Sequence, residues 1–163
     1  MKEQPRVTSL EPLDEDPCLV EVKIDGAVVG TAARDELHSS QAQIGMAADD
    51  PCVLVLRRSI KMRTTRSLAM GLISRCEFPR AGLTLRLIKH GIDETLAHDV
   101  VEEIAHDGWI DDESYARRRL RSLREHEGHS SEECRKRLKA EWVDTAIVER
   151  LIAGEDRRQP ESE

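Results

Sequence analysis

RLIKHGID, residues 86–93, has the same pattern as RLKAEWVD, residues 137–144, which lies 51 residues further along the chain. Arg-Leu opens both segments, and an apolar residue followed by Asp closes both. The match continues at the same offset, where Leu96 aligns with Ile147. An internal repeat of this length predicts tandem units that stack on their neighbours and present a continuous surface to a partner.

The apolar periodicity around the repeat is that of amphipathic helices. After Gly91, apolar residues recur every four positions in two adjacent rows: Ile92, Leu96, Val100 and Ile104, then Ala97, Val101 and Ala105. Asp93 supplies an N-cap and Gly108 a stop. Equivalent signals predict five more helices: around 68–73, from Pro79 to Gly91, from Asp111 or Asp112 onward, from the Ser130/Glu133 capping box, and from Asp144 onward.

Strand signals dominate the first part of the chain. Val20, Val22 and Ile24 alternate with polar residues, and the Asp-Gly pair at 25–26 can adopt the two positive φ angles of a tight hairpin turn. A short helix is expected from Arg34 to His38, and a further β-rich run from Cys52 to Leu56. A sheet with so few strands is small and relies on packing against the rest of the chain.

Together these patterns predict a mainly α fold. A small β-hairpin-containing module at 1–56 precedes two tandem three-helix repeats at 57–110 and 111–154, in an elongated and curved arrangement. Residues 155–163 are polar and are expected to be disordered. The total of 163 residues allows one ordinary domain, or a small domain with an appendage, and only a modest core.

The net charge of −7 conceals a block pattern. Residues 57–92 carry nine basic side chains against one acidic, a net +8, and residues 115–140 carry nine against four, a net +5; the segment between them, 93–114, is −9. The acidic total argues against a dedicated nucleic-acid binder. The few aromatic residues argue against an RNA surface that stacks bases: Phe78, Trp109, Tyr115 and Trp142.

Residue types that carry chemistry are scattered. The four cysteines form no Cys-x-x-Cys pair and lack histidines at metal-ligand spacing, so they are expected to be reduced and metal-free: Cys18, Cys52, Cys76 and Cys134. His126 and His129 are expected in a solvated loop. The sequence has neither a glycine-rich phosphate loop nor a nucleophile elbow, so we expect a non-enzymatic protein without a cofactor.

A cytoplasmic location is expected from two further observations. No stretch approaches the ~18 consecutive apolar residues that would cross a bilayer. The N-terminus also lacks the apolar core of a signal peptide.

Residues 108–117, GWIDDESYAR, preceded by LIKHGI at 87–92, resemble the RecX family of bacterial proteins that regulate the RecA recombinase. In that family, an Asp-x-x-Phe/Tyr-Ala element joins the first and second three-helix repeats. The resemblance includes LISR at 72–75 and covers residues 62–154. The VKIDG turn at 22–26 resembles an N-terminal extension found in some members.

Carboxylates open this joining element, and at a helix start they are read as capping groups and not as metal ligands. The element as a whole is expected to form the structural joint between the repeats: Trp109, Ile110, Asp111, Asp112, Tyr115 and Ala116. Among these, the apolar and aromatic side chains are expected to pack in the joint. Arg119 departs from the family, which usually has an aromatic or aliphatic residue there. Its stem is expected to pack while its guanidinium reaches out.

The helix after Asp112 carries a basic face. Ala116, Leu120 and Leu123 share one side, and four arginines occupy the opposite arc with almost no acidic counter-charge. The next helix adds three more basic residues, which gives a predicted partner-binding surface of seven: Arg117, Arg118, Arg121, Arg124, Arg135, Lys136 and Lys139. The alternative is an ordinary solvated face.

The resemblance implies a monomer that lies in the groove of a RecA–DNA filament and inhibits the recombinase, with single- or double-stranded DNA as a further partner and no membrane. A sequence-independent DNA-binding protein and a helical scaffold for another partner are the alternatives. Two departures from the family pattern change what is expected. Pro79 and Gly82 replace a capping box, so that helix start is expected to be weak. Many members also have a third repeat, and without it the reach along a filament is expected to be shorter.

Overall fold

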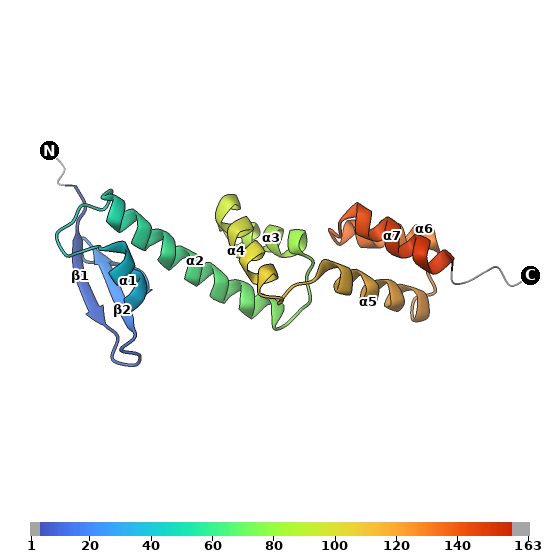
Figure 1. The fold of residues 1–163 in the computed structure, drawn as a ribbon, viewed down its shortest axis with the longest axis horizontal. Helices are drawn as coiled ribbons and strands as arrows, with labels where there is room; N and C mark the ends of the chain where they lie inside the picture. The colour runs from blue at the N-terminus through green and yellow to red at the C-terminus, as the bar shows by residue number, and fades with distance from the viewer. Residues whose placement is uncertain (1–3, 158–163) are drawn as a thin grey trace, which may run out of the picture. The chain divides into compact units, whose positions relative to one another are not determined.

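Residues 4–157 are described here from a computed structural model, and the chain divides into two compact units, residues 1–64 and 65–163. Within the described residues a three-stranded sheet precedes seven helices (Figure 1). The elements are β1 (Val7–Pro12), β2 (Leu19–Ile24), β3 (Ala27–Ala33), α1 (Arg34–Ser40), α2 (Pro51–Ile73), α3 (Arg80–Lys89), α4 (Glu94–His106), α5 (Asp112–Glu125), α6 (Ser131–Ala140) and α7 (Thr145–Asp156). The predicted mainly α fold with a small N-terminal β module is confirmed.

The predicted hairpin is present. β2 and β3 pair antiparallel around Asp25 and Gly26, whose φ angles are 48° and 77°. Val20, Val22 and Ile24 on β2 are all buried, as their alternation with polar residues indicated. The short helix predicted from residue 34 is α1.

One strand was not identified from the sequence. β1 pairs antiparallel with β2, which makes β2 the central strand of the sheet. Val7 is the one buried residue of β1, so the strand lacks the apolar alternation that would have marked it. Its end is held from outside the sheet, where the Val7 N–H donates to the carbonyl of Met46.

The β-rich run expected from Cys52 to Leu56 is wrong, because these residues form the first turns of α2. Pro51 occupies the first helical position, and the Asp50 carboxylate accepts a hydrogen bond from the Cys52 N–H at 2.9 Å. Val53, Leu56 and Ile60 are buried at helical spacing and join the core under the sheet. The boundary between the two units falls within this helix, between residues 64 and 65, and not after residue 56.

Unit 2 contains the remaining helices. The two apolar rows predicted after Gly91 are largely buried in α4, where Ala97, Val100, Val101, Ile104 and Ala105 face inward. The last three helices share one apolar cluster: Ala116, Leu120, Leu123, Cys134, Leu138, Val143, Val148 and Ile152. The structure places no membrane-length apolar helix in residues 4–157.

The N-terminal caps follow the 51-residue offset. Asp93 caps α4 by accepting from the Leu96 N–H, and its counterpart Asp144 caps α7 by accepting from the Ala146 N–H. Ser130 caps α6 through the predicted capping box. Corresponding positions therefore start corresponding helices.

The C-terminal ends of α3 and α6 match as well. Gly91 has a φ of 84°, and Trp142, 51 residues later, has a φ of 66°. In each case the N–H of the following residue donates to a carbonyl of the helix: Ile92 to Leu87 in α3, and Val143 to Leu138 in α6. A bulky residue thus adopts a left-handed conformation that usually requires glycine.

The end of the chain departs from the prediction. α7 continues through Asp156, so residues 155 and 156 are helical although they were expected to be disordered. Asp156 is tied down there, because it accepts hydrogen bonds from Ser131 and Arg124. The rest of the predicted tail, from residue 158, lies outside the described residues.

Candidate partner-binding surface

Asp111 begins α5 as its N-cap. One carboxylate oxygen accepts from the N–H groups of Glu113 and Ser114 at 2.9 and 3.1 Å, and the other accepts from the Ser114 hydroxyl at 2.8 Å. These bonds from Ser114 are the main reason that the pKa of Asp111 is lowered. The carboxylate is committed to capping, as the sequence indicated.

Asp112, unlike its neighbour Asp111, supports the start of a different helix. Its carboxylate accepts from the backbone N–H of Arg80 at 2.7 Å, at the start of α3. The N-cap of α3 is Pro79, which has no side chain that could accept a hydrogen bond. The helix start expected to be weak is therefore supported by a residue of the second repeat.

The apolar members of the joint do not all pack. Ile110 and Ala116 are buried and Tyr115 is half-buried, but the Trp109 side chain is 61% exposed, which corrects the expectation that it packs in the joint. Trp109 instead lines a cleft of about 270 Å³ with Phe78 and residues of α2 and α5.

Arg119 points inward to a carboxylate, contrary to the expectation that its guanidinium reaches out. Its Nε donates to Glu141 at 2.9 Å, and the Tyr115 hydroxyl donates to the same carboxylate at 3.0 Å. A second nitrogen of Arg119 donates to Glu127, whose pKa is lowered chiefly by this bond. Burial, and then the adjacent Glu141, raise the pKa of Tyr115 to about 12.

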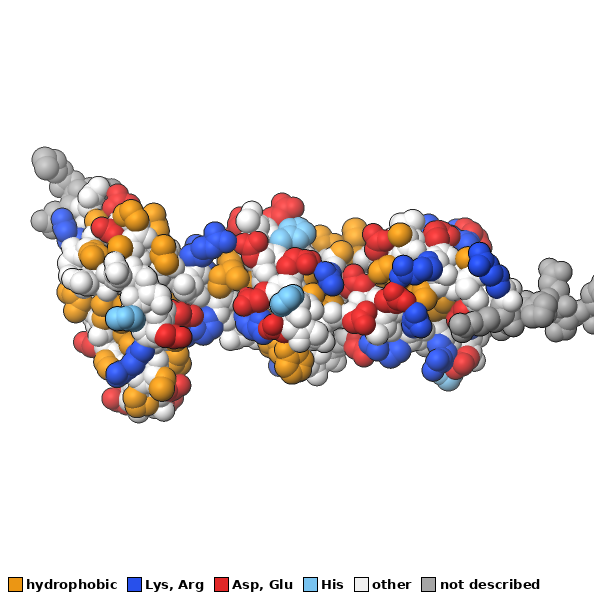
Figure 2. Space-filling model, in the orientation of Figure 1, with side chains coloured by type: hydrophobic (Ala, Val, Ile, Leu, Met, Phe, Trp, Pro, Cys, Tyr) orange, Lys and Arg blue, Asp and Glu red, His pale blue; other side chains and the backbone are white. Residues whose placement is uncertain are grey.

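The prediction that the basic face of α5 lacks acidic counter-charge is wrong. Arg117 pairs with Glu113 on its own helix, Arg118 with Glu77 in the segment before α3, and Arg124 with Asp156 on α7. Figure 2 shows the same mixture, with basic and acidic side chains interspersed over the C-terminal helices. The face is a charged network and not a purely cationic stripe.

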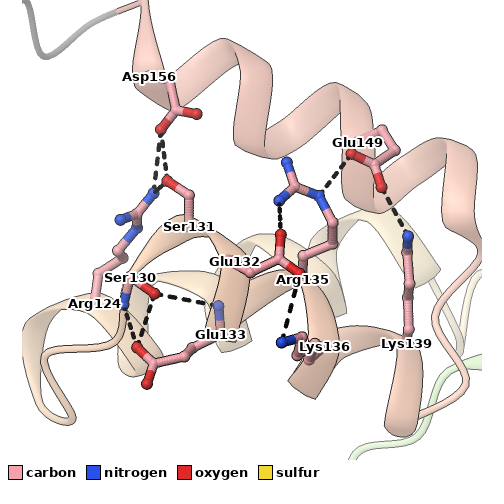
Figure 3. A network of polar contacts seen from close by, with 10 residues as sticks. All are labelled: Arg124, Ser130, Ser131, Glu132, Glu133, Arg135, Lys136, Lys139, Glu149 and Asp156. Carbon is pink, nitrogen blue, oxygen red and sulfur yellow. Dashed lines mark hydrogen bonds and ion pairs between the residues drawn. The ribbon is translucent and has the colours of Figure 1, made fainter.

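The cations of α6 are paired in the same way (Figure 3). Arg135 lies between Glu132 and Glu149, with both N···O distances at 2.8 Å. Lys139 also contacts Glu149 at 2.8 Å, and these two cations lower the pKa of that carboxylate, Lys139 more strongly. Lys136 makes a longer contact of 3.7 Å with Glu132.

Six of the seven predicted residues form ion pairs, and they differ in how exposed their side chains are. Arg124 and Arg135 are held, with side chains 26% and 28% exposed. Arg117, Arg118 and Lys136 are 65%, 57% and 74% exposed. Ion pairs at such exposed sites contribute ~0–1 kcal/mol, so a partner can exchange them easily. Lys139 is intermediate at 39%.

On helices α3 to α7, three exposed arginines have no side-chain partner within the described residues. Arg121 on α5 is one of them, and the sequence prediction included it. The other two are Arg86 on α3 and Arg137 on α6, which occupy the same position in the 51-residue repeat. The repeat alignment was the signal that could have identified this pair.

The fold and this surface define a class: a helical-repeat protein with a small β module. Within residues 4–157, no cluster of three or more His, Cys, Asp or Glu side chains could hold a metal ion. Four of the five helices after α2 have a side-chain N-cap of their own, and α3 is supported by Asp112.

Comparison with known proteins shows similarity to RecX proteins. No family model matches the chain. Over 91 residues, 56% of the chain, it is 31% identical to regulatory protein RecX of Mycobacterium avium (strain 104), and the match spans about half, 53%, of that relative. The fold is shared with a crystal structure of regulatory protein RecX (TM-score 0.68, 13% identity, covering 96% of this chain and 86% of that one).

A second crystal structure, of RecX from Lactobacillus salivarius, has a TM-score of 0.52 and 17% identity, and the likeness covers 55% of this chain and 58% of that one. The sequence match and the shared fold agree with the resemblance of residues 108–117 to the RecX family.

Proposed function

We propose that the chain binds the RecA–DNA filament in the bacterial cytoplasm and inhibits recombinase activity without catalysing a reaction. The similarity to regulatory protein RecX supports the regulatory role. A body built from two sets of short, capped helices supports a role in binding, because such repeats offer a surface longer than a single domain of this size would.

The observation that carries the proposal is the exposed cationic part of α5. Arg121 has no partner in the described part of the chain, and Arg117 and Arg118 have only exposed, exchangeable ones. Guanidinium groups form charge-assisted hydrogen bonds with carboxylates and phosphates, both of which a protein–DNA filament presents. Contacts of this kind weaken as salt screens them, so filament binding is expected to fall with ionic strength.

The other four predicted contact residues differ in whether they can contact a partner directly. Arg124 and Arg135 join α7 to α5 and α6 through Asp156 and Glu149. They would shape the second repeat and contribute little direct contact. Lys136 is exposed enough to contact a partner, and Lys139 only partly.

Co-sedimentation with preformed RecA–DNA filaments tests the proposal. The double variant Arg118→Glu/Arg121→Glu should bind more weakly than the unchanged chain, with a smaller inhibition of RecA ATP hydrolysis and strand exchange. Lys61→Glu is an exposed control in unit 1 that reverses one charge of the same sign. Absence of filament binding by the unchanged chain at low salt would reject the function.

Direct DNA binding without RecA is a second candidate. Arg86 and Arg137 favour it, because unpaired arginines at equivalent positions of two repeats could contact successive phosphates. Affinity for an oligonucleotide alone, lost in Arg86→Glu/Arg137→Glu and unchanged when RecA is added, would support this reading over the first.

A further inference from the structure

A groove of about 340 Å³ lies between α5 and α7 in the second unit. Three arginines, two glutamates and apolar side chains line it; the residues that matter here are Glu113, Arg117, Arg121, Arg150, Leu151, Gly154 and Glu155. Neither the repeat pattern nor the resemblance of the sequence pointed to it, because Arg150 and Gly154 lie on α7, outside the predicted basic face.

The groove already holds one carboxylate between two guanidiniums. One oxygen of Glu113 accepts from Arg117 and the other from Arg150, both at 2.5 Å. These cations lower the pKa of Glu113. Both guanidiniums remain largely exposed, at 65% and 62%, so a carboxylate from outside can compete for them.

The groove has a cation at Arg121 that is unpaired within residues 4–157, and open space at Gly154. The Arg121 side chain is exposed and has neither a hydrogen bond nor an ion pair to the described residues. A Cβ at Gly154 would meet no atom within 4 Å, so the space beside it is open. Leu151 is only partly buried at the edge of the apolar cluster. A cation without a counter-charge therefore lies beside open space and an apolar side chain.

We propose that this groove binds an acidic protein segment that also carries an apolar side chain. A carboxylate of the segment pairs with Arg121, a second competes with Glu113 for Arg117 and Arg150, and the apolar side chain packs on Leu151 beside Gly154. The inference rests on the proposed function and deepens it, because it names the chemistry that the filament protein would present.

The groove favours a protein segment over a nucleic acid. Glu113 and Glu155 both line it, and their negative charges oppose a continuous phosphate backbone, which has one charge per nucleotide, more strongly than a segment that brings two carboxylates. The arginines pair with a carboxylate as well as with a phosphate, so Leu151 decides between them, because it gains from an apolar neighbour that a phosphodiester chain does not supply.

The test uses fluorescence anisotropy of a fluorescein-labelled peptide of alternating Asp, Leu and Glu with the full chain. Gly154→Leu fills the open space, yet leucine favours a helix more than glycine does, so the variant should fold with an equal or higher Tm. We expect Gly154→Leu and Arg121→Glu each to weaken peptide binding by about tenfold, the loss of one charged or packed contact. Arg75→Glu, an equal change of charge at an exposed arginine after α2, should leave it unchanged.

The outcomes separate the groove from the proposed function. No peptide binding by the unchanged chain, equal binding by all variants, or preference for a single-stranded oligonucleotide lost in Arg121→Glu would each overturn the groove proposal. Filament co-sedimentation of the same variants is measured in parallel. Filament binding that survives in Gly154→Leu overturns the groove proposal and leaves the proposed function intact. Peptide binding by an unchanged chain that does not bind filaments overturns the proposed function and leaves the groove proposal intact.

Discussion

Asp112 on α5 accepts a hydrogen bond from the backbone N–H of Arg80 on α3 at 2.7 Å. The bond links the second set of helices to the first at the point where Pro79 cannot cap its own helix. A residue whose neighbour Asp111 already caps α5 is thus used to support another helix.

Asp112→Ala is therefore expected to destabilise the protein. Loss of a helix-capping carboxylate costs ~1 kcal/mol, measurable as a lower free energy of unfolding in urea. Asp112→Asn keeps an oxygen acceptor and should recover most of the difference. Equal stability of all three proteins would show that this hydrogen bond contributes nothing in solution.

Trp142 provides a second test, since it holds a left-handed conformation where the first repeat has Gly91. Trp142→Gly should raise the free energy of unfolding by ~0.5–1 kcal/mol. A left-handed conformation costs a bulky residue roughly 1–2 kcal/mol, and glycine avoids this cost. Part of the gain is offset because glycine has more conformational freedom in the unfolded chain. The ring is 58% exposed, so little packing is lost. Gly91→Ala is the reciprocal change and should lower stability; a loss in Trp142→Gly would contradict the expectation.

The Tyr115 hydroxyl makes the free energy of unfolding depend on pH in the alkaline range. Its pKa is raised to about 12 in the folded chain, above the ordinary value of 10.0, so the unfolded chain loses this proton first. The stability associated with the neutral hydroxyl is present below pH ~10 and is lost as the pH rises toward 12. Tyr115 is the single tyrosine of the chain, so tyrosinate absorbance reports it directly. Tyr115→Phe should remove this part of the pH dependence; an ordinary titration near pH 10 would refute the shift.

Much of the fold could be predicted because its signals are local. The hairpin at Asp25 and Gly26, the apolar rows of α4 and the caps at Asp93 and Asp144 all depend on residues within a few positions of one another. The run from Cys52 to Leu56 failed because five apolar residues suit a strand or a helix, and burial of every third or fourth side chain decides between them.

The candidate surface was less predictable, because its counter-charges come from elsewhere in the chain. Arg118 meets Glu77, which is 41 positions away, and Arg124 meets Asp156, 32 positions away. A single-helix view therefore shows a cationic arc where the folded chain has a network. Trp109 could not be placed either, since an aromatic residue after a helix stop can pack inside or line a cleft.

The Arg119–Glu141 pair tests whether such a network stabilises the fold. Both side chains are about a quarter exposed, at 28% and 27%, and Glu141 also accepts the Tyr115 hydroxyl. A double-mutant cycle of Arg119→Ala and Glu141→Ala should give a coupling energy of roughly 1 kcal/mol, as expected for partly buried groups in one network. The matched control is Arg118 with Glu77, whose side chains are 57% and 63% exposed and whose coupling should lie near zero. If the Arg119–Glu141 coupling is also near zero, Arg119 stabilises the chain only through its packed stem, and an aliphatic residue at this position would serve equally well.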